Sequence, residues 1–591
     1  MSIYKKRTKQ FNESYLSIKK RHKVLGILRV LAFCGIIYSF YLFMRQENYY
    51  LLLITGGILI FFLVLLRLHV SMTWKLEYQR ALKDINKDEE EFLEDDVREF
   101  DGGKEFEVQN HPYSFDLDVF GERSLFQYLN RTASYNGAKK LADLLNEQLL
   151  PNEIIENQEA VKELSQKLDW RHKILAYNKM SKIDRSTFDY LKKWSESDVK
   201  LVSKKSMYAA YILPGLLLLS VVLYFIESHL IWGYLVSLFF SLNLVLSIMK
   251  VKQIQQELSG ADKIHETVEN YASIFKKIEK ESFQSKKMIE LVDVLQNKDF
   301  RSSKEFKVLS SHFEKLNTVA NIFVNVVFNG FWQFHVHSLN SLLIWKKKNA
   351  KYVMLSVEVV AEIEALNSLA NFSYNNRKYT FPNLSVKQEM SFKDLGHPLI
   401  NTTKRVCNDI DFRDQRFVIL TGSNMSGKST FLRTVGINLV LANIGAPICA
   451  TGATFISLPL FVSMRLTDSL EDSESYFYAE VKRLKEIVES VAIQPCFVLL
   501  DEILRGTNSD DKQSGTIGVI KKLIHQKTYG LIATHDLEVC EVANDYPDIV
   551  VNKCFEVAFV EDELVFDYKI QDGICKNKNA TFIMKKMQII D

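Results

Sequence analysis

A short glycine-containing segment constrains the fold of this chain more than any other feature. Residues 421–430 read T-G-S-N-M-S-G-K-S-T and contain a complete G-x-x-x-x-G-K-S motif. The apolar run 417–420 precedes the motif, and the run 431–442, which suits a helix, follows it. Strand, glycine loop and helix in this order form the context in which the motif binds nucleotide phosphates.

The residue types of this loop suit a phosphate and a magnesium ion. Backbone N–H groups of the loop and of the helix start can surround phosphate oxygens. Lys428 can reach the β- and γ-phosphates, and the hydroxyl of Ser429 can hold Mg²⁺. We therefore predict that ATP binds through Gly422, Ser423, Asn424, Met425, Ser426, Gly427, Lys428, Ser429 and Thr430.

Hydrolysis needs acidic groups besides the loop, and these follow a second apolar run. Residues 497–500 are apolar and end in Asp501 and Glu502. Asp501 suits coordination of Mg²⁺, and Glu502 is placed to orient or deprotonate the attacking water. These features predict a Mg²⁺-dependent ATPase.

Two further residues are candidates for contact with phosphate. The apolar run 529–533 ends in Thr534 and His535, and His535 is expected to face the γ-phosphate. Ser475 precedes a predicted helix, whose N-terminal N–H groups favour an anion. We predict Lys428, Glu502 and His535 as the catalytic residues, while the local sequence leaves open whose phosphate Ser475 meets.

Four apolar runs come in two closely spaced pairs. Run 24–44 is interrupted only by Arg29, and run 49–66 carries no charge. Runs 207–226 and 230–249 form the second pair. Each has roughly the 17–25 residues that cross a bilayer as a helix. We therefore expect four transmembrane helices in two hairpins, in contact with membrane lipid.

The charges around these runs predict their orientation. Basic residues are concentrated on the cytoplasmic side of membrane proteins. They cluster before the first run and at the outer ends of the others, whereas the two short turns carry only Arg45. Both termini and the ATPase domain are thus expected in the cytoplasm, with the chain integral to a bacterial inner membrane.

The overall composition excludes some alternatives. The net charge is +3 with a pI of about 8.2, which is no global signature of nucleic-acid binding. The seven cysteines are scattered without a C-x-x-C pair, which fits a reducing compartment rather than a disulfide framework or a zinc site.

The predicted fold class is a multidomain protein. It combines an α-helical core and lever, four transmembrane helices in two hairpins, and a C-terminal α/β P-loop ATPase domain of the ABC type. Helical stretches are expected at 125–150, ended by Pro151, and at 153–180, 253–297 and 340–372. The expected divisions are a basic tail (1–23), a transmembrane hairpin (24–66), a charged linker (67–112), helical core (113–206), a second hairpin (207–249), the lever and second part of the core (250–385), and the ATPase domain with a C-terminal dimerisation segment (386–591).

The motifs resemble those of the MutS family. That family's phosphate loop reads T-G-P-N-M-x-G-K-S-T, and here Ser423 replaces the proline and Ser426 the usual glycine. Its D-E-x-x-R-G-T-S corresponds to residues 501–508, with Leu504 in place of a glycine. Its A-T-H corresponds to 533–535. Its S-T-F-x-x-E corresponds to 475–480, and its R-H-P to Gly396-His397-Pro398.

Weaker resemblances lie outside the ATPase domain. They cover 121–145, 157–164, 363–370 and the segment 568–586, so the likeness spans about 113–591 except the hairpin at 207–249. The resemblance implies a homodimer with two composite ATP sites, in which Ser475 and the stretch after Glu502 act on the partner's nucleotide. ATP binding would close the dimer, and hydrolysis would reopen it.

The resemblance also implies DNA binding and a role in mismatch repair. The G-x-F-[FY]-E motif of mismatch-recognising relatives is not found, which argues against direct reading of mismatches. A protein client at the membrane therefore stays open. An ABC-type membrane ATPase acting on a protein or solute is the main alternative, although L-S-G-G-Q is absent. Intact Lys428, Asp501 and Glu502 argue against a non-catalytic scaffold.

Overall fold

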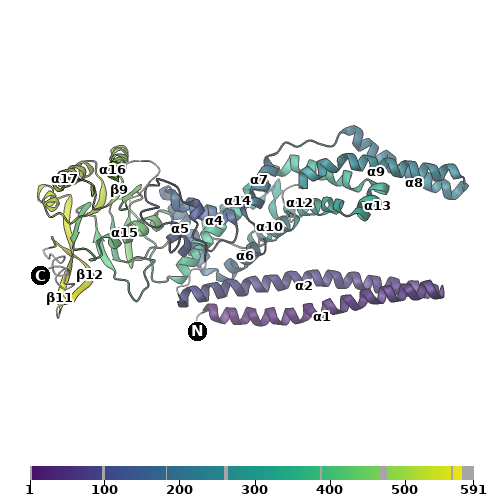
Figure 1. The fold of residues 1–591 in the computed structure, drawn as a ribbon, viewed down its shortest axis with the longest axis horizontal. Coiled ribbons are helices and arrows are strands. Elements are labelled where there is room, and N and C mark those ends of the chain that lie inside the picture. The colour runs from purple at the N-terminus through teal and green to yellow at the C-terminus, as the bar shows by residue number, and fades with distance from the viewer. Residues whose placement is uncertain are drawn as a thin grey trace.

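The computed structural model describes residues 3–95, 100–181, 183–258, 264–385, 389–465, 476–560 and 563–575. The molecule is elongated, with a sheet-containing region at one end and two helical hairpins extending toward the other (Figure 1). Helices fill the region between them. The predicted division into a helical part and a C-terminal part with sheets matches this arrangement.

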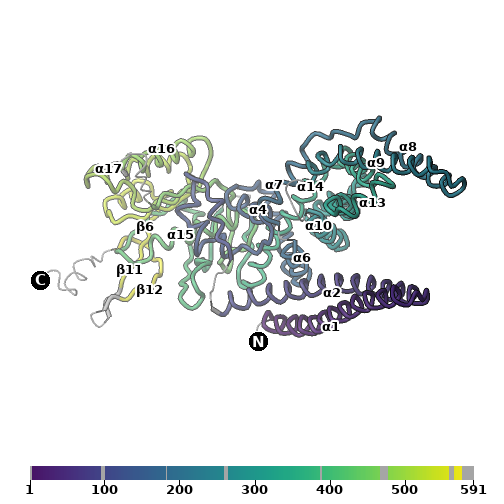
Figure 2. The backbone as a smooth tube through the Cα atoms, turned by 45° about the vertical axis from the view of Figure 1, so that its right-hand side comes forward, coloured from purple at the N-terminus to yellow at the C-terminus, as the bar shows by residue number. Residues whose placement is uncertain are grey.

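Two hairpins of long helices contain the four apolar runs. The first is formed by α1 (Ile3–Gln46) and α2 (Tyr49–Asp95), the second by α8 (Lys204–Glu227) and α9 (Leu230–Leu258). All four helices are long and apolar enough to cross a membrane. Both hairpins point away from the sheets, in the same general direction (Figures 1 and 2).

The helices of the first hairpin extend well beyond the apolar runs. The expected basic tail is part of α1 from Ile3 onward, because residues 3–23 contain neither proline nor glycine to end the helix. Most of the charged linker likewise continues α2 as far as Asp95. The buried side chain of Glu89 forms an ion pair with Arg131 and so ties this hairpin to the helical core.

The middle region is helical, with one correction to the predicted boundaries. Pro151 begins a helix rather than only ending one, because proline lacks an N–H and its fixed φ suits the first helical position. The stretch 153–180 is two helices, which meet at Lys167. The middle helices are α3 (Leu125–Leu129), α4 (Tyr135–Asn146), α5 (Pro151–Gln166), α6 (Leu168–Ser181), α7 (Arg185–Glu196), α10 (Ile264–Ile278), α11 (Lys286–Leu295), α12 (Ser302–Asn317) and α13 (Ile322–Trp332).

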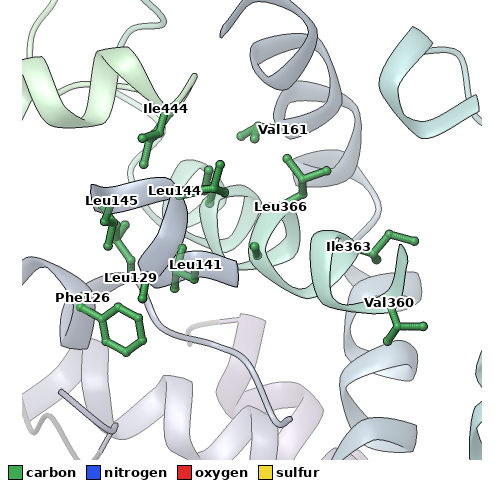
Figure 3. Packing of buried hydrophobic residues seen from close by; sticks show 14 of the residues in the cluster. Phe126, Leu129, Leu141, Leu144, Leu145, Val161, Val360, Ile363, Leu366 and Ile444 are labelled. Atoms are coloured by element: carbon green, nitrogen blue, oxygen red, sulfur yellow. The ribbon is translucent and has the colours of Figure 1, made fainter. Parts of the chain in front are cut away.

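One long helix, α14 (Phe334–Asn375), runs through this region toward the sheets. It packs against α4, α5, α7 and α12. Figure 3 shows side chains of α4, α5 and α14 in one apolar interior, with Ile444 beside them. Ile444 follows the helix α15 (Lys428–Asn443), and its carbonyl accepts a hydrogen bond from Asn157 Nδ2 at 3.2 Å. The end of α15 therefore contacts the helical core directly.

A six-stranded sheet forms the centre of the C-terminal region, in the order β12-β11-β6-β10-β9-β8. All neighbours are parallel except β11 and β12. Alternate side chains face opposite sides: Val418 and Leu420 join the core around α15, while Phe417 and Ile419 pack with the helices of the other face. The strands and covering helices are β6 (Phe417–Gly422), β8 (Leu460–Ser463), β9 (Phe497–Asp501), β10 (Tyr529–Ala533), β11 (Val550–Val560), β12 (Glu563–Asp572), α16 (Tyr476–Ile493), α17 (Ser509–His525) and α18 (Val542–Asp545).

A smaller four-stranded sheet, in the order β3-β7-β4-β5, lies in the same region. Buried Asn438 of α15 connects to it, donating to Gly396 O at 3.0 Å and accepting from Cys449 N at 2.8 Å. These bonds position the segment around His397 beside α15. The strands are β3 (Asn383–Leu384), β4 (Ser391–Leu395), β5 (Asn408–Asp411) and β7 (Gly452–Phe455), and a separate two-stranded ribbon pairs β1 (Gln296–Asn297) with β2 (Phe300–Arg301).

Candidate active site

The register of three parallel strands brings the predicted catalytic residues to one edge of the sheet. Leu420 of β6 pairs with Ala533 of β10, and Ala533 pairs with Asp501 of β9. The strands therefore end level with one another. The loop after β6, Glu502 after β9 and His535 after β10 all begin at this carboxyl edge, where open parallel sheets bind their ligands.

Two glycines allow the tight course of the loop between β6 and α15. Gly422 has φ 157°, and a Cβ there would lie 2.6 Å from Ser426 Oγ. Gly427 has φ 105° and immediately precedes α15. The 105° value lies in a region that side chains with a Cβ rarely adopt. Gly427 is thus favoured by its backbone conformation, and Gly422 by the close approach of Ser426 and of Phe555 O.

The side chain of Lys428 is enclosed by its own loop. Its exposed fraction is 5%, and Nζ donates to Gly422 O at 2.9 Å and to Ser423 O at 3.1 Å. Burial lowers the pKa of this ammonium group. The positive charge is thereby held inside the loop by two neutral carbonyl groups.

Glu502 and His535 form a hydrogen-bonded pair beside Lys428. His535 Nε2 lies 2.8 Å from Glu502 Oε1 and 3.2 Å from Lys428 Nζ. The shorter contact is explained if His535 carries its proton on Nε2 and donates it to the Glu502 carboxylate. Lys428 Nζ can only donate, so it cannot accept this proton. This hydrogen bond is the main reason why the pKa of Glu502 is lowered to about 2.

The backbone at Glu502 is also unusual. Its φ is 48°, in the left-handed region, and its N–H donates to Ala533 O at 3.0 Å. Left-handed non-glycine residues are maintained only when the surroundings fix them, and they cluster at functional sites. The bond from β10 provides such fixation and turns the Glu502 side chain toward His535.

Asp501 and Ser429 provide oxygen atoms of the kind that Mg²⁺ prefers. Asp501 is 7% exposed, and its Oδ1 atom is buried without a hydrogen-bond partner. An unpaired buried carboxylate oxygen fits a site that gains a cation on substrate binding. No cluster of three or more His, Cys, Asp or Glu suited to a metal occurs among the described residues.

A cavity of about 540 Å³ opens beside the loop. Its size lies within the range of small-molecule sites. Besides the loop, its lining includes aromatic, apolar and polar side chains from other segments. The lining residues are Leu395, His397, Ile400, Lys404, Val406, Asn408, Asn424, Met425, Ser426, Gly427, Lys428, Ser429, Thr430, Phe431, Thr434, Glu502, Phe555 and Tyr568.

Tyr568 reaches the cavity from the distant strand β12. A Cβ on Gly427 would lie 3.1 Å from its ring. Its backbone is held by Asn408 of β5, whose Nδ2 donates to Tyr568 O at 3.0 Å and whose Oδ1 accepts from Ile570 N at 2.9 Å. The family-like segment 568–586 begins at Tyr568, but nothing in the sequence placed this residue at the cavity, because its position depends on how β11 and β12 pair.

Two residues without an assigned role organise the segment after Glu502. Glu480 accepts from Leu504 N at 2.7 Å and from Arg505 N at 3.2 Å. Arg505 in turn donates to Glu502 O at 2.9 Å and to Asp501 O at 3.1 Å. Both residues belong to motifs seen in the sequence: Arg505 to D-E-x-x-R and Glu480 to S-x-F-x-x-E. Ser475, in the second pattern, lies outside the described residues.

The structure therefore brings together most of the predicted site. Residues 424–430 and Glu502 share the cavity, and Gly422, Ser423 and His535 contact Lys428 at its inner end. Met425 is 78% exposed and lies at the cavity rim. Asp501, the last residue of β9, is more deeply buried and does not line the cavity.

Comparison with known proteins gives matches to one family. The family model of MutS domain V matches residues 418–589. The DNA mismatch repair protein MutS of Thermotoga maritima is 34% identical over 251 residues, 41% of this chain and 31% of that protein. MutS protein homolog 4 of Homo sapiens is 29% identical over 228 residues, 37% of this chain and 24% of that protein.

A third relative gives the same picture. The DNA mismatch repair protein MutS of Clostridium botulinum is 30% identical over 237 residues, 38% of this chain and 25% of that protein. The chain thus spans less than a third of the length of these curated relatives. The domain V match includes the phosphate loop, Asp501 and Glu502 at the end of β9, and the histidine after β10. The C-terminal region of the chain, residues 418–589, is therefore similar to domain V of the MutS family.

Proposed function

We propose that this chain is a Mg²⁺-dependent ATPase anchored in a membrane. The observation that carries the proposal is the meeting of Lys428, Glu502 and His535 at the carboxyl ends of three neighbouring strands. ATP would lie in the cavity with its phosphates on the loop 422–429.

Each of these residues then has a distinct task. Lys428 exchanges its two carbonyl partners for β- and γ-phosphate oxygens, a charged and therefore stronger interaction. Glu502 accepts a hydrogen bond from the attacking water and orients it, and its low pKa keeps it ionised at neutral pH. His535 holds the Glu502 carboxylate in place and lies near enough to respond to the γ-phosphate.

The residues present fit a bound magnesium ion. Ser429 Oγ and the carboxylate of Asp501 would hold it, directly or through water. When bound, Mg²⁺ neutralises the charge that develops on the phosphate oxygens. Arg505, bonded to the carbonyl oxygens of Asp501 and Glu502, keeps both acids in position.

Several cavity residues outside the loop suit a nucleobase. Tyr568 and His397 offer ring faces, and Ile400 and Val406 offer apolar contact. Stacking on rings combined with apolar contact is a common way to hold a base. We therefore propose that the adenine lies against Tyr568 and His397.

The domain divisions and the anchoring belong to the same proposal. The four apolar helices would cross the inner membrane of a bacterium with both termini and the ATPase domain in the cytoplasm. Membrane extraction by carbonate at high pH tests the anchoring. An integral chain stays with the lipid pellet, whereas release into the supernatant would contradict it.

Motion in the ATPase domain has a direct route to the helical lever. The loop leads into α15, whose end contacts α5, and α5 packs against α14. In a homodimer of the MutS type, closure of two composite sites would move this unit. Ser475 would then meet the nucleotide of the partner subunit. Binding energy would thus be converted into relative motion of long helices.

The client of this motion is either DNA or a membrane protein. DNA is suggested by the relatives, which are named as DNA mismatch repair proteins. These two clients are distinguished by measuring ATP hydrolysis by the detergent-purified chain. The assay is run without DNA, with homoduplex and with mismatched duplex, each at two salt concentrations. Stimulation that weakens with salt supports DNA, since phosphate contacts release counterions. Turnover unaffected by DNA indicates a client at the membrane.

A further inference from the structure

The segment between α12 and the first turns of α14 has an unusual composition. The 30 residues 316–345 contain no Asp, Glu, Lys or Arg, although a quarter of the whole chain is charged. Lys315 precedes this stretch, and Lys346, Lys347 and Lys348 follow it. A stretch without charges suits surroundings that exclude water, which can be protein interior or lipid.

The helix in this stretch, α13, exposes large apolar side chains. Ile322 is 79% exposed, Phe323 74% and Trp332 63%, and Val326, Phe328 and Phe331 are each more than a third exposed. At 11 residues α13 is too short to cross a bilayer. Contiguous exposed apolar surface of this kind marks an interaction site for protein or membrane.

Contacts place α13 level with the apolar part of the second hairpin. Gly330 O accepts from Asn243 Nδ2 at 3.0 Å, and the rings of Phe331 and Phe240 are 5.3 Å apart. Both partners belong to the apolar run 230–249 of α9. Figures 1 and 2 show α13 beside α9. Whatever medium surrounds this part of α9 therefore also surrounds α13.

The start of α14 lies at the same level. His337 Nε2 is 3.3 Å from Ala210 O, and its ring is 4.7 Å from that of Tyr211. Both residues lie in the apolar run 207–226 of α8. The elbow between α13 and α14 therefore packs against the second hairpin on one side. On the other side, α13 exposes its apolar side chains.

Side chains cap the breaks in the helical backbone at this elbow. Gln333 is fully buried with φ 53°, and its Nε2 donates to Asn243 O at 2.6 Å. Asn329 Oδ1 accepts from His335 N at 2.9 Å, and Asn325 Nδ2 donates to Val319 O at 3.1 Å. Non-helical backbone at membrane depth is tolerated only where the protein supplies such partners.

We propose that α13 and the elbow that follows it enter the hydrocarbon layer as a re-entrant segment. The partner of the exposed face of α13 is the acyl-chain region of the bilayer, because this face continues the apolar surface of α8 and α9. The inference rests on the proposed membrane anchoring of the second hairpin. It adds a direct consequence: the long helix α14 begins inside the membrane, so its motion is delivered to lipid depth.

A fluorescence experiment on the full chain tests this insertion. Cys34 and Cys407 are the two cysteines that are not buried, so a C34S/C407S background leaves five enclosed thiols. Phe323→Cys, Leu218→Cys and Leu355→Cys are then labelled singly with nitrobenzoxadiazole, and each protein is reconstituted into phosphatidylcholine–phosphatidylglycerol vesicles. Part of the lipid carries a nitroxide on its acyl chain, which quenches a fluorophore nearby.

The three positions distinguish the inference from the anchoring on which it rests. Leu218 is 66% exposed on α8 and reports on the hairpin, whereas Leu355 is 49% exposed on α14 beyond the uncharged stretch. We expect loss of fluorescence at positions 218 and 323 but not at 355. Loss at 218 alone would overturn the re-entrant segment and leave the anchoring intact. Loss at neither would overturn both, and elution of each labelled protein as a single species controls for misfolding.

Discussion

The two ends of this molecule treat polar groups in opposite ways. At the sheet end, Lys428 and Glu502 line a cavity, and Asp501, which precedes Glu502, has a buried oxygen without a hydrogen-bond partner. At the hairpin end, apolar side chains face outward, while Asn243 and Gln333 bond to each other inside. One end is suited to exchange partners with a charged substrate. At the other end, Gln333 Nε2 and Asn243 bond to each other beneath an apolar surface, while Gln333 Oε1 has no hydrogen-bond partner.

The difference shows how function is divided along the chain. The sheet end contains strained backbone at Glu502 and a buried cation whose pKa is lowered. Such features cost stability and persist where chemistry uses them. The hairpin end contains no comparable cluster of ionised groups among its described residues. Under the proposed function, this end anchors the chain and receives motion through α14.

The largest effect is expected from Lys428→Ala at the sheet end. Removal of the ammonium group leaves the phosphate charge without its main partner, so turnover should fall by about 10³-fold or more. Affinity for ATP should fall as well. Steady-state hydrolysis and equilibrium binding of a fluorescent ATP analogue measure the two effects. Lys512→Ala, on α17 and outside the cavity, is the matched control, and equal loss in both variants would contradict the assignment.

Glu364 of α14 tests the region between the ends. Complete burial raises its pKa to about 7, although Ala133 N and Ser134 Oγ donate to it. Because the folded pKa lies above the usual 4.5, stability should be greatest at acid pH and decrease as pH rises from about 4.5 to about 7.

Glu364→Gln removes this charge, so the variant should be more stable than the native chain at pH 8, by up to about 3 kcal/mol, and nearly equal at pH 4.5. Thermal unfolding in detergent at pH 4.5 and pH 8 measures this difference in stability. Glu358→Gln, exposed on the same helix, should change neither value. A native chain whose stability rises between pH 4.5 and 7 relative to Glu364→Gln would refute the assigned shift.

His535→Asn tests the role assigned to the hydrogen bond between His535 and Glu502 at the sheet end. Loss of the hydrogen bond to Glu502 should reduce turnover by about 10²-fold. The pKa of Glu502 should also rise from about 2 toward its usual range. A base is lost when pH falls through its pKa, so the acid limb of the pH–rate profile should move to higher pH in the variant. An unmoved acid limb would mean that His535 does not set this pKa.

Gly330→Ala should have the smallest effect, at the hairpin end. A Cβ at this position would lie 2.2 Å from the ring of Phe240, so α13 and α9 must separate slightly. Such overpacking costs about 1–3 kcal/mol. Thermal unfolding should show the loss while ATP turnover in detergent stays unchanged. The double variant with Phe240→Leu makes room for the methyl group and should recover most of the stability; no recovery would contradict the proposed contact.

The sequence revealed the sheet end more fully than the hairpin end, for a physical reason. Lys428, Glu502 and His535 each follow an apolar strand, and parallel strands bring their carboxyl ends together wherever they lie in the sequence. Local patterns therefore sufficed. Tyr568 could not be found in this way, since its place over Gly427 depends on pairing between β12 and distant segments.

At the hairpin end the four long apolar runs were evident, but α13 was not. Its apolar run is too short for a transmembrane signal and is interrupted by asparagines. Asn325 and Asn329 look polar in the sequence, yet both bond within the elbow. Only the tertiary contacts with Asn243 place this segment beside α9.

The most direct test of the ATPase assignment is Glu502→Gln in the full chain. The substitution keeps the size of the side chain and removes its charge and basicity. We predict that ATP binding persists while turnover falls by about 10²- to 10⁴-fold. Parallel measurement of bound ATP analogue and released phosphate on the same purified protein gives both quantities. Turnover equal to that of the native chain would contradict the proposed role of Glu502 and, with it, the proposed catalytic site.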